Sequence, residues 1–521
     1  MSKNCYITTP IYYASGKVHI GNSYSTVACD TFARYHRLKG DDTYFLTGMD
    51  EHGQKIENVA ANNNVTPQEF VNKIAVETQQ LWKNLNVTNN DFICTSEERH
   101  TKVVQDIFEQ LLAQDDIYLG HYEGDYCVPC EAFFTKTQLN EDGTCPDCGR
   151  KTIKVQEESY FLRLKKYEKR LLDYIKDNPE FIQPASRRNE VISFIEQGLE
   201  DLCVSRTSFK WGIPVKSNPK HVIYVWIDAL SNYITALGYG SDDPSKYEKY
   251  WLNNDQVYHV IGKDILRFHA IYWPIMLMAL NIPINFKLYV HGWILMKDGK
   301  MSKSFGNIVY PMDVVNEYGL DSLRYYLVKE MPLGNDGLFS WDRFIERYNV
   351  DLANDLGNLV SRSISMINKY FDSKINKPSK LYFEEEVDFE GVMSSAIHKT
   401  LTCFDNFEFQ TGLNELWTII RRANKYIDET APWVLAKDET KKDALESVMY
   451  HLYEAIRLAA ILVSPVMPDA SKIILDELNV SEENRTYNSL KYGETEAAEV
   501  TKTPIVLFKR LDVQKELAKH E

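Results

Sequence analysis

The chain has 521 residues, of which 44% are hydrophobic and 26% charged, and its formal net charge is −15. This length fits about three or four domains. The longest strongly apolar run, residues 271–280, contains a proline and is well short of the roughly 18 residues of a membrane helix, so composition and pattern argue against a membrane protein. The acidic balance argues against a protein that coats nucleic acid, although local basic clusters remain compatible with it.

The first part of the chain alternates between strand and helix patterns. Residues 5–9 and 43–47 have the β-branched and aromatic composition of strands, and residues 23–38 between them have a helical pattern. The run Thr66-Pro67-Gln68-Glu69 is a capping box with proline at the first helical position. The predicted buried face of the helix that follows consists of Phe70, Ile74, Leu81 and Leu85. The pattern is that of an α/β protein, and because the first strand begins at once, we expect a cytoplasmic protein without a signal peptide.

The turn after the first strand has the residues of a phosphate site. In "PIYYASGKVHIGNSYS", residues 10–25, His19 and Asn22 can donate hydrogen bonds, and Gly21 permits close approach to the backbone. A strand-to-helix turn in a parallel sheet presents backbone N–H groups to anions. Taken alone, a histidine beside a glycine is more often an ordinary surface or core residue.

Four of the nine cysteines form two Cys-x-x-Cys pairs, Cys127 with Cys130 and Cys145 with Cys148. Four thiolates in this pattern make a closed tetrahedral site, which predicts one structural zinc ion per chain. The alternative is a pair of disulfides, which a reducing cytosol disfavours. The remaining cysteines, which we expect to be reduced core thiols, are Cys5, Cys29, Cys94, Cys203 and Cys403.

Further along the chain, residues 221–226 and 257–265 resemble buried parallel strands, so the sheet is expected to resume after a long insertion. From about residue 350 the pattern is helical. Between these parts lies "GKMSKSFGN", residues 299–307, in which Lys300 and Lys303 can converge on a polyphosphate. The alternative interpretation of this segment is a solvated charged turn.

Two of these segments together resemble a known family. "KMSKS" at 300–304 and "HIGN" at 19–22 are similar to the two signature motifs of class I aminoacyl-tRNA synthetases. The segments "TTPIYYASGKVHIGN", "FLTGMDEHG", "YVWIDALSNY", "HVIGKDILRFH", "LGNLVSR" and "APWVLAK" occur in the order seen in methionyl-tRNA synthetases. Isoleucine and valine enzymes carry a larger editing domain than the insertion of roughly 100 residues allows. A non-catalytic zinc-knuckle RNA-binding protein would not need both motifs.

The resemblance implies a Rossmann-like catalytic domain with an inserted connective domain, followed by a helical anticodon-binding bundle. The implied boundaries are 1–115 and 221–290 for the two catalytic halves, 116–220 for the zinc-knuckle insertion, 291–350 for the linking domain with "KMSKS", and 351–521 for the bundle. It implies a monomer for the chain as given, and a dimer where a further C-terminal domain follows.

The implied activity is ligation of L-methionine to methionine tRNA through methionyl-adenylate. The implied catalytic residues are His19, Asn22, Lys300 and Lys303. The implied ATP-binding residues are Tyr12, His19, Gly21, Asn22, Gly262, Asp264 and Lys303, with Asp264 on the ribose and Mg²⁺ arriving with ATP. Asn22 stands where the family commonly has histidine, so a cationic role is lost at that position.

The resemblance also implies the residues that bind methionine and the anticodon. The implied methionine-binding residues are Ile11, Tyr13, Asp50, Trp226, Ala229, Leu230, Tyr233, Ile265 and His269, with Asp50 on the ammonium group. Asn358, Arg362 and Trp433 are implied to read the anticodon CAU. Without the resemblance, the tryptophans and Tyr233 would be interpreted as core residues. Candidate basic clusters for tRNA phosphates are Lys165-Lys166, Arg187-Arg188 and Arg421-Arg422 with Lys425.

Overall fold

The computed structural model describes residues 3–127, 132–134, 139–146, 149–296, 299–300, 308–383 and 385–520. The chain divides into two compact units. The first, which we call the sheet unit, comprises Lys3–Val18 and Thr43–Val290. The second, the helical unit, comprises His19–Asp42 and residues 291–520. The implied division into five domains stays a prediction, because the two units group the chain more coarsely. Within the described ranges, every helix is too short or too polar to cross a membrane.

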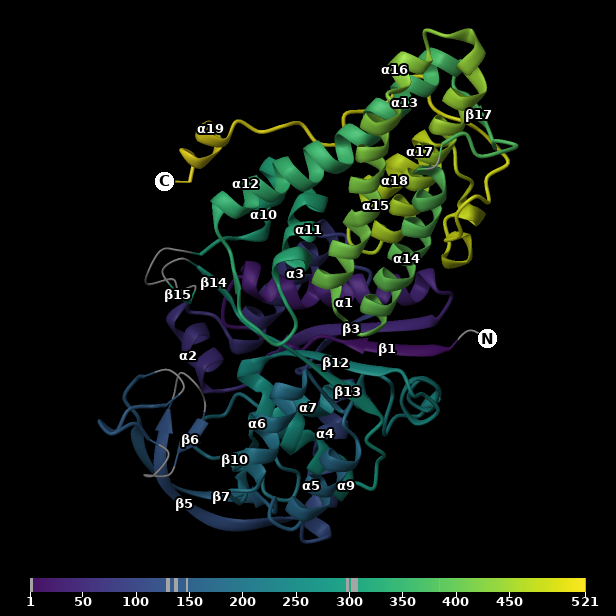
Figure 1. The fold of residues 1–521 in the computed structure, drawn as a ribbon. Helices are drawn as coiled ribbons and strands as arrows, with labels where there is room; N and C mark the ends of the chain where they lie inside the picture. Colours follow the sequence, from purple (N-terminus) through teal and green to yellow (C-terminus); the bar gives the residue numbers. More distant parts are fainter. Residues whose placement is uncertain are drawn as a thin grey trace. The chain divides into compact units, whose positions relative to one another are not determined.

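The sheet unit is built on a seven-stranded sheet with the order β2-β3-β1-β12-β13-β8, in which β4 also pairs with β3 (Figure 1). Its strands are β1 Asn4–Thr8, β2 Tyr12–Tyr13, β3 Asp42–Asp50, β4 Asp91–Cys94, β8 Ile182–Gln183, β12 Val257–Gly262 and β13 Phe286–His291. Strands β1 and β12 are parallel, with Thr8 opposite His259. The expectation that the sheet resumes after a long insertion is therefore confirmed.

The helices of the sheet unit are α2 Gln54–Asn62, α3 Pro67–Asn84, α4 Glu98–Ala113, α5 Glu168–Asp177, α6 Ala185–Ile195, α7 Val225–Thr235, α8 Ser245–Tyr247 and α9 Trp273–Ala279. The capping box of α3 is confirmed, since Thr66 Oγ1 accepts from the Glu69 N–H and Glu69 Oε2 accepts from the Thr66 N–H. The predicted buried face is wrong in part. Val71, Ile74, Ala75, Thr78 and Trp82 are buried on the helix, whereas Phe70 and Leu81 are half-buried, because Trp82 rather than Leu81 turns inward.

The long insertion contains a second, antiparallel sheet. Its strand order is β6-β5-β7-β9, with β5 Ile117–Cys127, β6 Ala132–Phe134, β7 Ile153–Leu162 and β9 Leu202–Cys203. A small two-stranded sheet follows, with β10 Ser205–Arg206 and β11 Val222–Ile223. The predicted strand 221–226 is therefore wrong, because only two of its residues are in a strand and α7 begins at Val225. Helix α7 is almost entirely buried, so its continuous apolar run could not be told from a buried strand.

The helical unit begins with α1 Ile20–Leu38, which starts three residues before the predicted helix. A buried ion pair fixes α1 to α11 (Leu320–Glu330), since Arg324 Nη2 lies 2.7 Å from Asp30 Oδ2. Arg324 also donates through Nε to the Val466 carbonyl oxygen at 2.9 Å. Arg34 donates to the same Asp30 carboxylate at 2.8 Å. The first signature motif thus belongs structurally to the C-terminal half of the chain.

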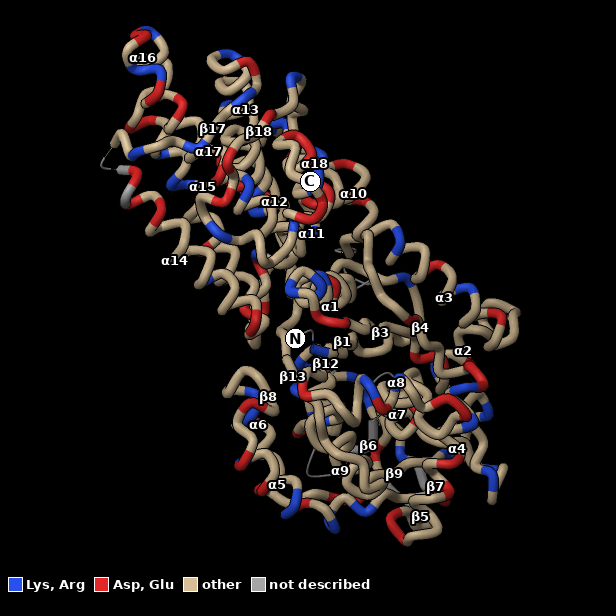
Figure 2. Tube along the Cα trace, turned by 90° about the vertical axis from the view of Figure 1, so that its right-hand side faces the viewer, with Lys and Arg blue, Asp and Glu red and all other residues tan. Residues whose placement is uncertain are grey.

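The rest of the helical unit is mainly a helix bundle, with α16 at one end of it (Figures 1 and 2). Its helices are α10 Pro311–Tyr318, α12 Trp341–Arg347, α13 Asn358–Phe371, α14 Glu385–Asp405, α15 Phe409–Thr430, α16 Pro432–Leu435, α17 Lys442–Val463, α18 Pro468–Glu477 and α19 Val513–Leu517. Its short strands are β14 Ile294–Met296, β15 Gly299–Lys300, β16 Gly337–Leu338, β17 Lys374–Asn376 and β18 Ala497–Glu499. The predicted architecture, a parallel-sheet α/β part followed by helices, is confirmed.

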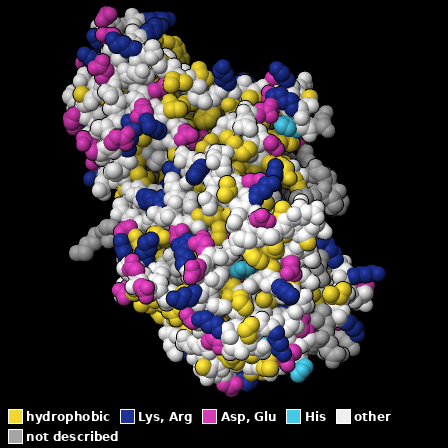
Figure 3. All heavy atoms as spheres, turned by 180° about the vertical axis from the view of Figure 1, so that it is seen from behind, with side chains coloured by type: hydrophobic (Ala, Val, Ile, Leu, Met, Phe, Trp, Pro, Cys, Tyr) yellow, Lys and Arg dark blue, Asp and Glu magenta, His cyan; other side chains and the backbone are white. Residues whose placement is uncertain are grey.

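Basic and acidic residues are intermixed along the chain in Figure 2 and over the face seen in Figure 3. The candidate basic clusters contact acidic residues of the same chain. Lys166 Nζ lies 2.5 Å from Asp116 Oδ1, Arg187 Nη1 lies 2.8 Å from Glu190 Oε2, and Lys425 Nζ lies 3.1 Å from Glu429 Oε1. Phosphate groups would have to compete with these carboxylates.

Candidate active site

The sheet unit contains a cavity of about 210 Å³ near the carboxyl ends of its parallel strands. All nine residues that the sequence assigned to methionine line it, although they come from four separate segments of the chain. The complete lining is Pro10, Ile11, Tyr13, Asp50, Lys55, Val225, Trp226, Ala229, Leu230, Tyr233, Ile265 and His269. The position agrees with the general rule that open parallel sheets bind ligands at this edge.

Part of the cavity wall is a hydrogen-bonded pair of rings. The Tyr233 hydroxyl lies 2.7 Å from His269 Nε2, and His269 Nδ1 lies 2.9 Å from the Ile265 carbonyl oxygen. A carbonyl only accepts, so Nδ1 carries the hydrogen. Burial lowers the pKa of His269 to about 4, which keeps the ring neutral near pH 7. Nε2 therefore accepts from Tyr233.

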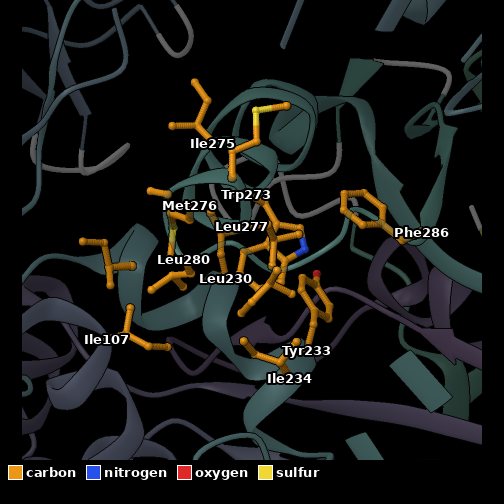
Figure 4. Packing of buried hydrophobic residues seen from close by; sticks show 14 of the residues in the cluster. Ile107, Leu230, Tyr233, Ile234, Trp273, Ile275, Met276, Leu277, Leu280 and Phe286 are labelled. Atoms are coloured by element: carbon orange, nitrogen blue, oxygen red, sulfur yellow. The ribbon is translucent and has the colours of Figure 1, made fainter. Parts of the chain in front are cut away.

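Packing behind the cavity holds this tyrosine in place. The Tyr233 ring stacks on His259, with ring centroids 4.0 Å apart, and the Tyr6 hydroxyl donates to the Tyr233 carbonyl oxygen at 2.8 Å. Figure 4 shows Tyr233 among the apolar side chains of α7 and α9, next to Trp273. The Tyr233 ring is therefore held on both its ring face and its backbone, and this part of the wall carries no charge near pH 7.

The other part of the cavity carries charge of both signs. Asp50 ends β3 and is only 7% exposed, and Tyr13 lies opposite it in the β2–β3 register. Lys55 Nζ lies 5.2 Å from the centre of the Tyr13 ring. Trp226 stacks on Phe268 at 3.5 Å between centroids. A carboxylate, an ammonium group and apolar walls suit a small zwitterion with an apolar side chain.

The first signature motif forms the N-terminus of α1 in the helical unit. His19 is the N-cap, and its Nδ1 accepts from the Gly21 N–H at 3.1 Å. Because Nδ1 accepts, the hydrogen of the neutral ring is on Nε2, which can donate to a phosphate oxygen. Asn22 Oδ1 accepts from the His19 N–H at 3.4 Å, so the amide NH₂ is its donor group. A Cβ at position 21 would lie 2.9 Å from His19 Cε1, which explains the glycine.

The other residues assigned to ATP are divided between the two units. Gly262 ends β12 and the exposed Asp264 follows it in a short turn of the sheet unit. Tyr12 is 8% exposed, with its ring 5.6 Å from that of Trp82. The backbone of Lys300 pairs with Leu295 in the β14–β15 hairpin. Lys303 lies outside the described residues.

The three residues assigned to the anticodon are exposed side chains of the helical unit. Asn358 begins α13, and Arg362 follows one turn later on the same face. Arg362 Nη2 lies 3.9 Å from Asp428 Oδ1, near the end of α15. Trp433, five residues further along the chain, is 44% exposed. Arg362 is thus close to the end of the helix that leads to Trp433.

Comparison with known proteins agrees with this geometry. Residues 5–155 and 148–364 match the family model described as tRNA synthetases class I (M), and residues 379–519 match that of the anticodon binding domain of methionyl tRNA ligase. The methionine–tRNA ligase of Enterococcus faecalis is 53% identical over 98% of this chain and 78% of its own length, and that of Bacillus subtilis is 51% identical over 98% and 79%. A crystal structure of Mycobacterium tuberculosis methionyl-tRNA synthetase bound by methionyl-adenylate covers 97% of this chain and 100% of its own, at 37% identity and a TM-score of 0.92.

The chain belongs to the methionyl-tRNA synthetase family. Members of this family are class I ligases that join methionine to tRNA, and the resemblance stated from the motifs is confirmed. The comparisons do not test the role of any single residue, so the assignments above stay predictions.

Half of the predicted zinc ligands lie among the described residues. Cys127, at the end of β5, and Cys145 are both fully buried and share one small cluster, against which Leu139 packs. Cys130 and Cys148 lie outside the described residues. Within the described ranges no group of three or more metal-ligating side chains occurs, and half of the predicted set is outside them.

Sequence reasoning missed three residues of the cavity. Pro10 and Val225 are neighbours of Ile11 and Trp226 and add only apolar lining. Lys55 is the more informative omission. It follows Asp50 by five residues in "DEHGQK", and a cation in the first turn of α2, just after the loop that follows β3, was the available signal.

Proposed function

We propose that the protein binds methionine in the cavity of the sheet unit, activates it with ATP to methionyl-adenylate and transfers it to methionine tRNA. The observation that carries the proposal is the convergence on one cavity of the nine residues that the family resemblance implied for methionine, although they come from four separate segments of the chain. Asp50 would pair with the ammonium group. The thioether would lie against Tyr233 and His269, where sulfur–aromatic contact is worth about 0.3 to 1.5 kcal/mol.

The reaction needs alignment and charge neutralisation rather than a protein nucleophile, because the methionine carboxylate itself attacks the α-phosphate. His19 Nε2 and the Asn22 amide are donors at the start of α1, a position suited to phosphate oxygens. Lys300 and Lys303 would neutralise charge as pyrophosphate leaves. Asp264 would hold the ribose, and Mg²⁺ bound to the phosphates would supply further charge neutralisation.

The proposed tRNA contacts lie in the helical unit. Exposed Trp433 is suited to stacking on an anticodon base, and the side chains of Asn358 and Arg362 can bond to base edges. This assignment is supported by their exposure, since a core role would have buried the indole.

We also propose a structural zinc ion held by Cys127, Cys130, Cys145 and Cys148. The two described cysteines support it, one from each pair, because both are buried in the same cluster. The Gly149 N–H donates to the Cys145 carbonyl oxygen at 2.8 Å, which makes the tight turn that a Cys-x-x-Cys pair needs. Gly143 and Gly149 have φ of 77° and 70°, the left-handed region in which glycine is favoured.

The decisive experiment is amino-acid-dependent exchange of pyrophosphate into ATP, with each of the twenty amino acids in turn. We expect exchange with methionine far above that with any other. Fastest exchange with isoleucine or valine would reject the assignment of the cavity.

A further inference from the structure

A buried carboxylate lies behind the cavity and is bound by two histidines from other parts of the sheet unit. Asp228, on α7, is fully buried. Its Oδ2 lies 2.7 Å from His52 Nδ1, and its Oδ1 lies 2.8 Å from His100 Nε2. Both carboxylate oxygens thus accept from an imidazole, and each histidine lies more than 120 positions from Asp228 in the sequence.

His100 bridges two turns of α7. While its Nε2 contacts Asp228, its Nδ1 lies 2.7 Å from the Thr235 hydroxyl, and both His100 and Thr235 are buried. Asp228 and Thr235 are seven residues apart, which is about two helical turns, so they share one face of the helix. A single ring on α4 therefore fixes both the rotation and the axial position of α7.

His52 connects the same carboxylate to the loop after β3. It lies two residues after Asp50, and its ring lies 5.4 Å from that of Trp211. The Trp211 indole N–H donates to the Glu51 carbonyl oxygen at 2.5 Å, and the Gly53 N–H donates to the Trp211 carbonyl oxygen at 3.1 Å. The loop that presents Asp50 to the cavity is held on both sides of His52.

The face of α7 opposite to Asp228 lines the cavity. Trp226, Ala229, Leu230 and Tyr233 recur at helical spacing and all contribute to the cavity wall. At 100° per residue, Asp228 and Thr235 project about 180° to 200° away from Trp226. The residues that face the substrate and those that hold the helix are thus on opposite sides.

Charge makes this arrangement sensitive to the loss of one partner. Burial by itself raises the pKa of Asp228, but the two histidines outweigh it and lower the pKa, so the carboxylate is ionised. A buried carboxylate that loses a donor keeps the cost of desolvation without the compensating bond. The helix and the loop are therefore expected to shift together when one contact is removed.

We propose that Asp228, His52 and His100 are positioning residues for the amino-acid substrate, which set the distance between Asp50 on one wall of the cavity and the α7 face on the other. This inference rests on the proposed function, in that the cavity takes methionine. None of the three residues lines the cavity, so they act through the side chains that do.

Two substitutions at His100 distinguish a positioning role from a general loss of stability. Glutamine places its amide nitrogen near the position of Nε2, so His100→Gln keeps the donor to Asp228. Asparagine places it near Nδ1, so His100→Asn keeps only the contact with Thr235. In pyrophosphate exchange we expect the KM for methionine to rise at least tenfold in His100→Asn and less than threefold in His100→Gln, with the KM for ATP unchanged in both. Equal effects in the two variants, or a parallel rise in both KM values, would overturn the proposal.

Ser231→Ala is the matched control, since Ser231 is also buried on α7 but donates only within the helix, to the Ile227 carbonyl oxygen. If His100→Asn does not fold, the isosteric Asp228→Asn takes its place, with the same expected rise in the KM for methionine. An unchanged KM there would reject the proposal.

A measurement without substrate separates this proposal from the proposed function. We expect hydrogen–deuterium exchange of the α7 amides to be faster in ligand-free His100→Asn than in the wild type, His100→Gln or Ser231→Ala. Failure of the wild type to exchange pyrophosphate with methionine would reject the proposed function alone. Unchanged amide exchange in His100→Asn would reject the positioning role.

Discussion

At the scale of single residues, Asp321 is the clearest case of a carboxyl group whose ionisation opposes folding. It is the second residue of α11 and is 6% exposed, and its Oδ2 accepts from the Ala470 N–H at 2.6 Å. Burial raises its pKa from 3.8 to about 6. Because the folded pKa is the higher one, the protonated group stabilises the fold below pH 4, and this contribution is lost as pH rises through 6.

We therefore expect Asp321→Asn, which keeps the acceptor for Ala470 but cannot ionise, to be more stable than the wild type at pH 7, by about 3 kcal/mol at most. The difference should shrink to near zero below pH 4. Denaturation midpoints of the two proteins between pH 4 and pH 8 measure it. A difference that does not depend on pH would contradict the assignment.

The lysines of "KMSKS" are expected to act late in the reaction, when charge develops on the departing pyrophosphate. Lys303→Ala should lower the rate of activation about a hundredfold, which corresponds to roughly 2.7 kcal/mol, with little change in the KM for methionine. Pyrophosphate exchange gives both numbers, and Lys377→Ala, a surface substitution in the bundle, serves as the control. An unchanged rate in Lys303→Ala would remove this role from the motif.

At the scale of elements, short-range sequence patterns predicted several strands and a helix cap correctly but assigned the start of one helix wrongly. The capping box of α3 and strands β1 and β12 follow from short-range patterns that the structure confirms. The start of helix α7 was misassigned, because Val225 and Trp226 continue the apolar run of the preceding residues and a helix that is almost entirely buried carries no exposed polar face to mark its beginning. The cavity residues came from resemblance alone. Nothing local in the sequence indicates that His100 contacts Asp228, since that contact depends on the tertiary fold.

The turn that follows Cys145 is part of the proposed zinc site, which can be tested directly. We expect one zinc ion per chain, detected by elemental analysis of protein purified without chelators. Cys145→Ser should lose the metal, because three thiolates and a hydroxyl bind zinc more weakly than four thiolates. Cys403→Ser, which changes a cysteine outside the two pairs, should retain it. Zinc-free wild-type protein would contradict the proposed site.

At the scale of the whole molecule, a chain with a net charge of −15 has to bind a polyanion. The basic clusters do not give a uniform positive face, since six of their seven lysines and arginines contact carboxylates of the same chain. We therefore expect the affinity for tRNA to depend on a few specific contacts. The strongest candidates for such contacts are the exposed side chains at the end of the bundle near α16.

Trp433→Ala tests whether tRNA binding in the helical unit can be lost without loss of methionine activation in the sheet unit. The cavity is lined only by residues of the sheet unit, and Trp433 is a 44% exposed residue of the helical unit. We expect aminoacylation of tRNA to fall at least tenfold while tRNA-free pyrophosphate exchange stays within twofold of the wild type. Val434→Ala, at the neighbouring position, which is 52% exposed, should change neither step. A parallel fall in both steps would show that the indole stabilises the bundle instead.

The interleaving of the two units has a consequence for synthesis of the protein. Among the described residues, the chain passes between the units at 18/19, 42/43 and 290/291, so α1 is made early but packs against α11, which follows about 300 residues later. At about 5 to 20 residues per second, the ribosome needs roughly 15 to 60 s to supply that partner. Throughout this interval Phe32, Val27 and the other side chains that α1 buries in the folded protein lack the α11 partner, so we expect the nascent N-terminal segment to expose apolar surface of the kind that chaperones bind.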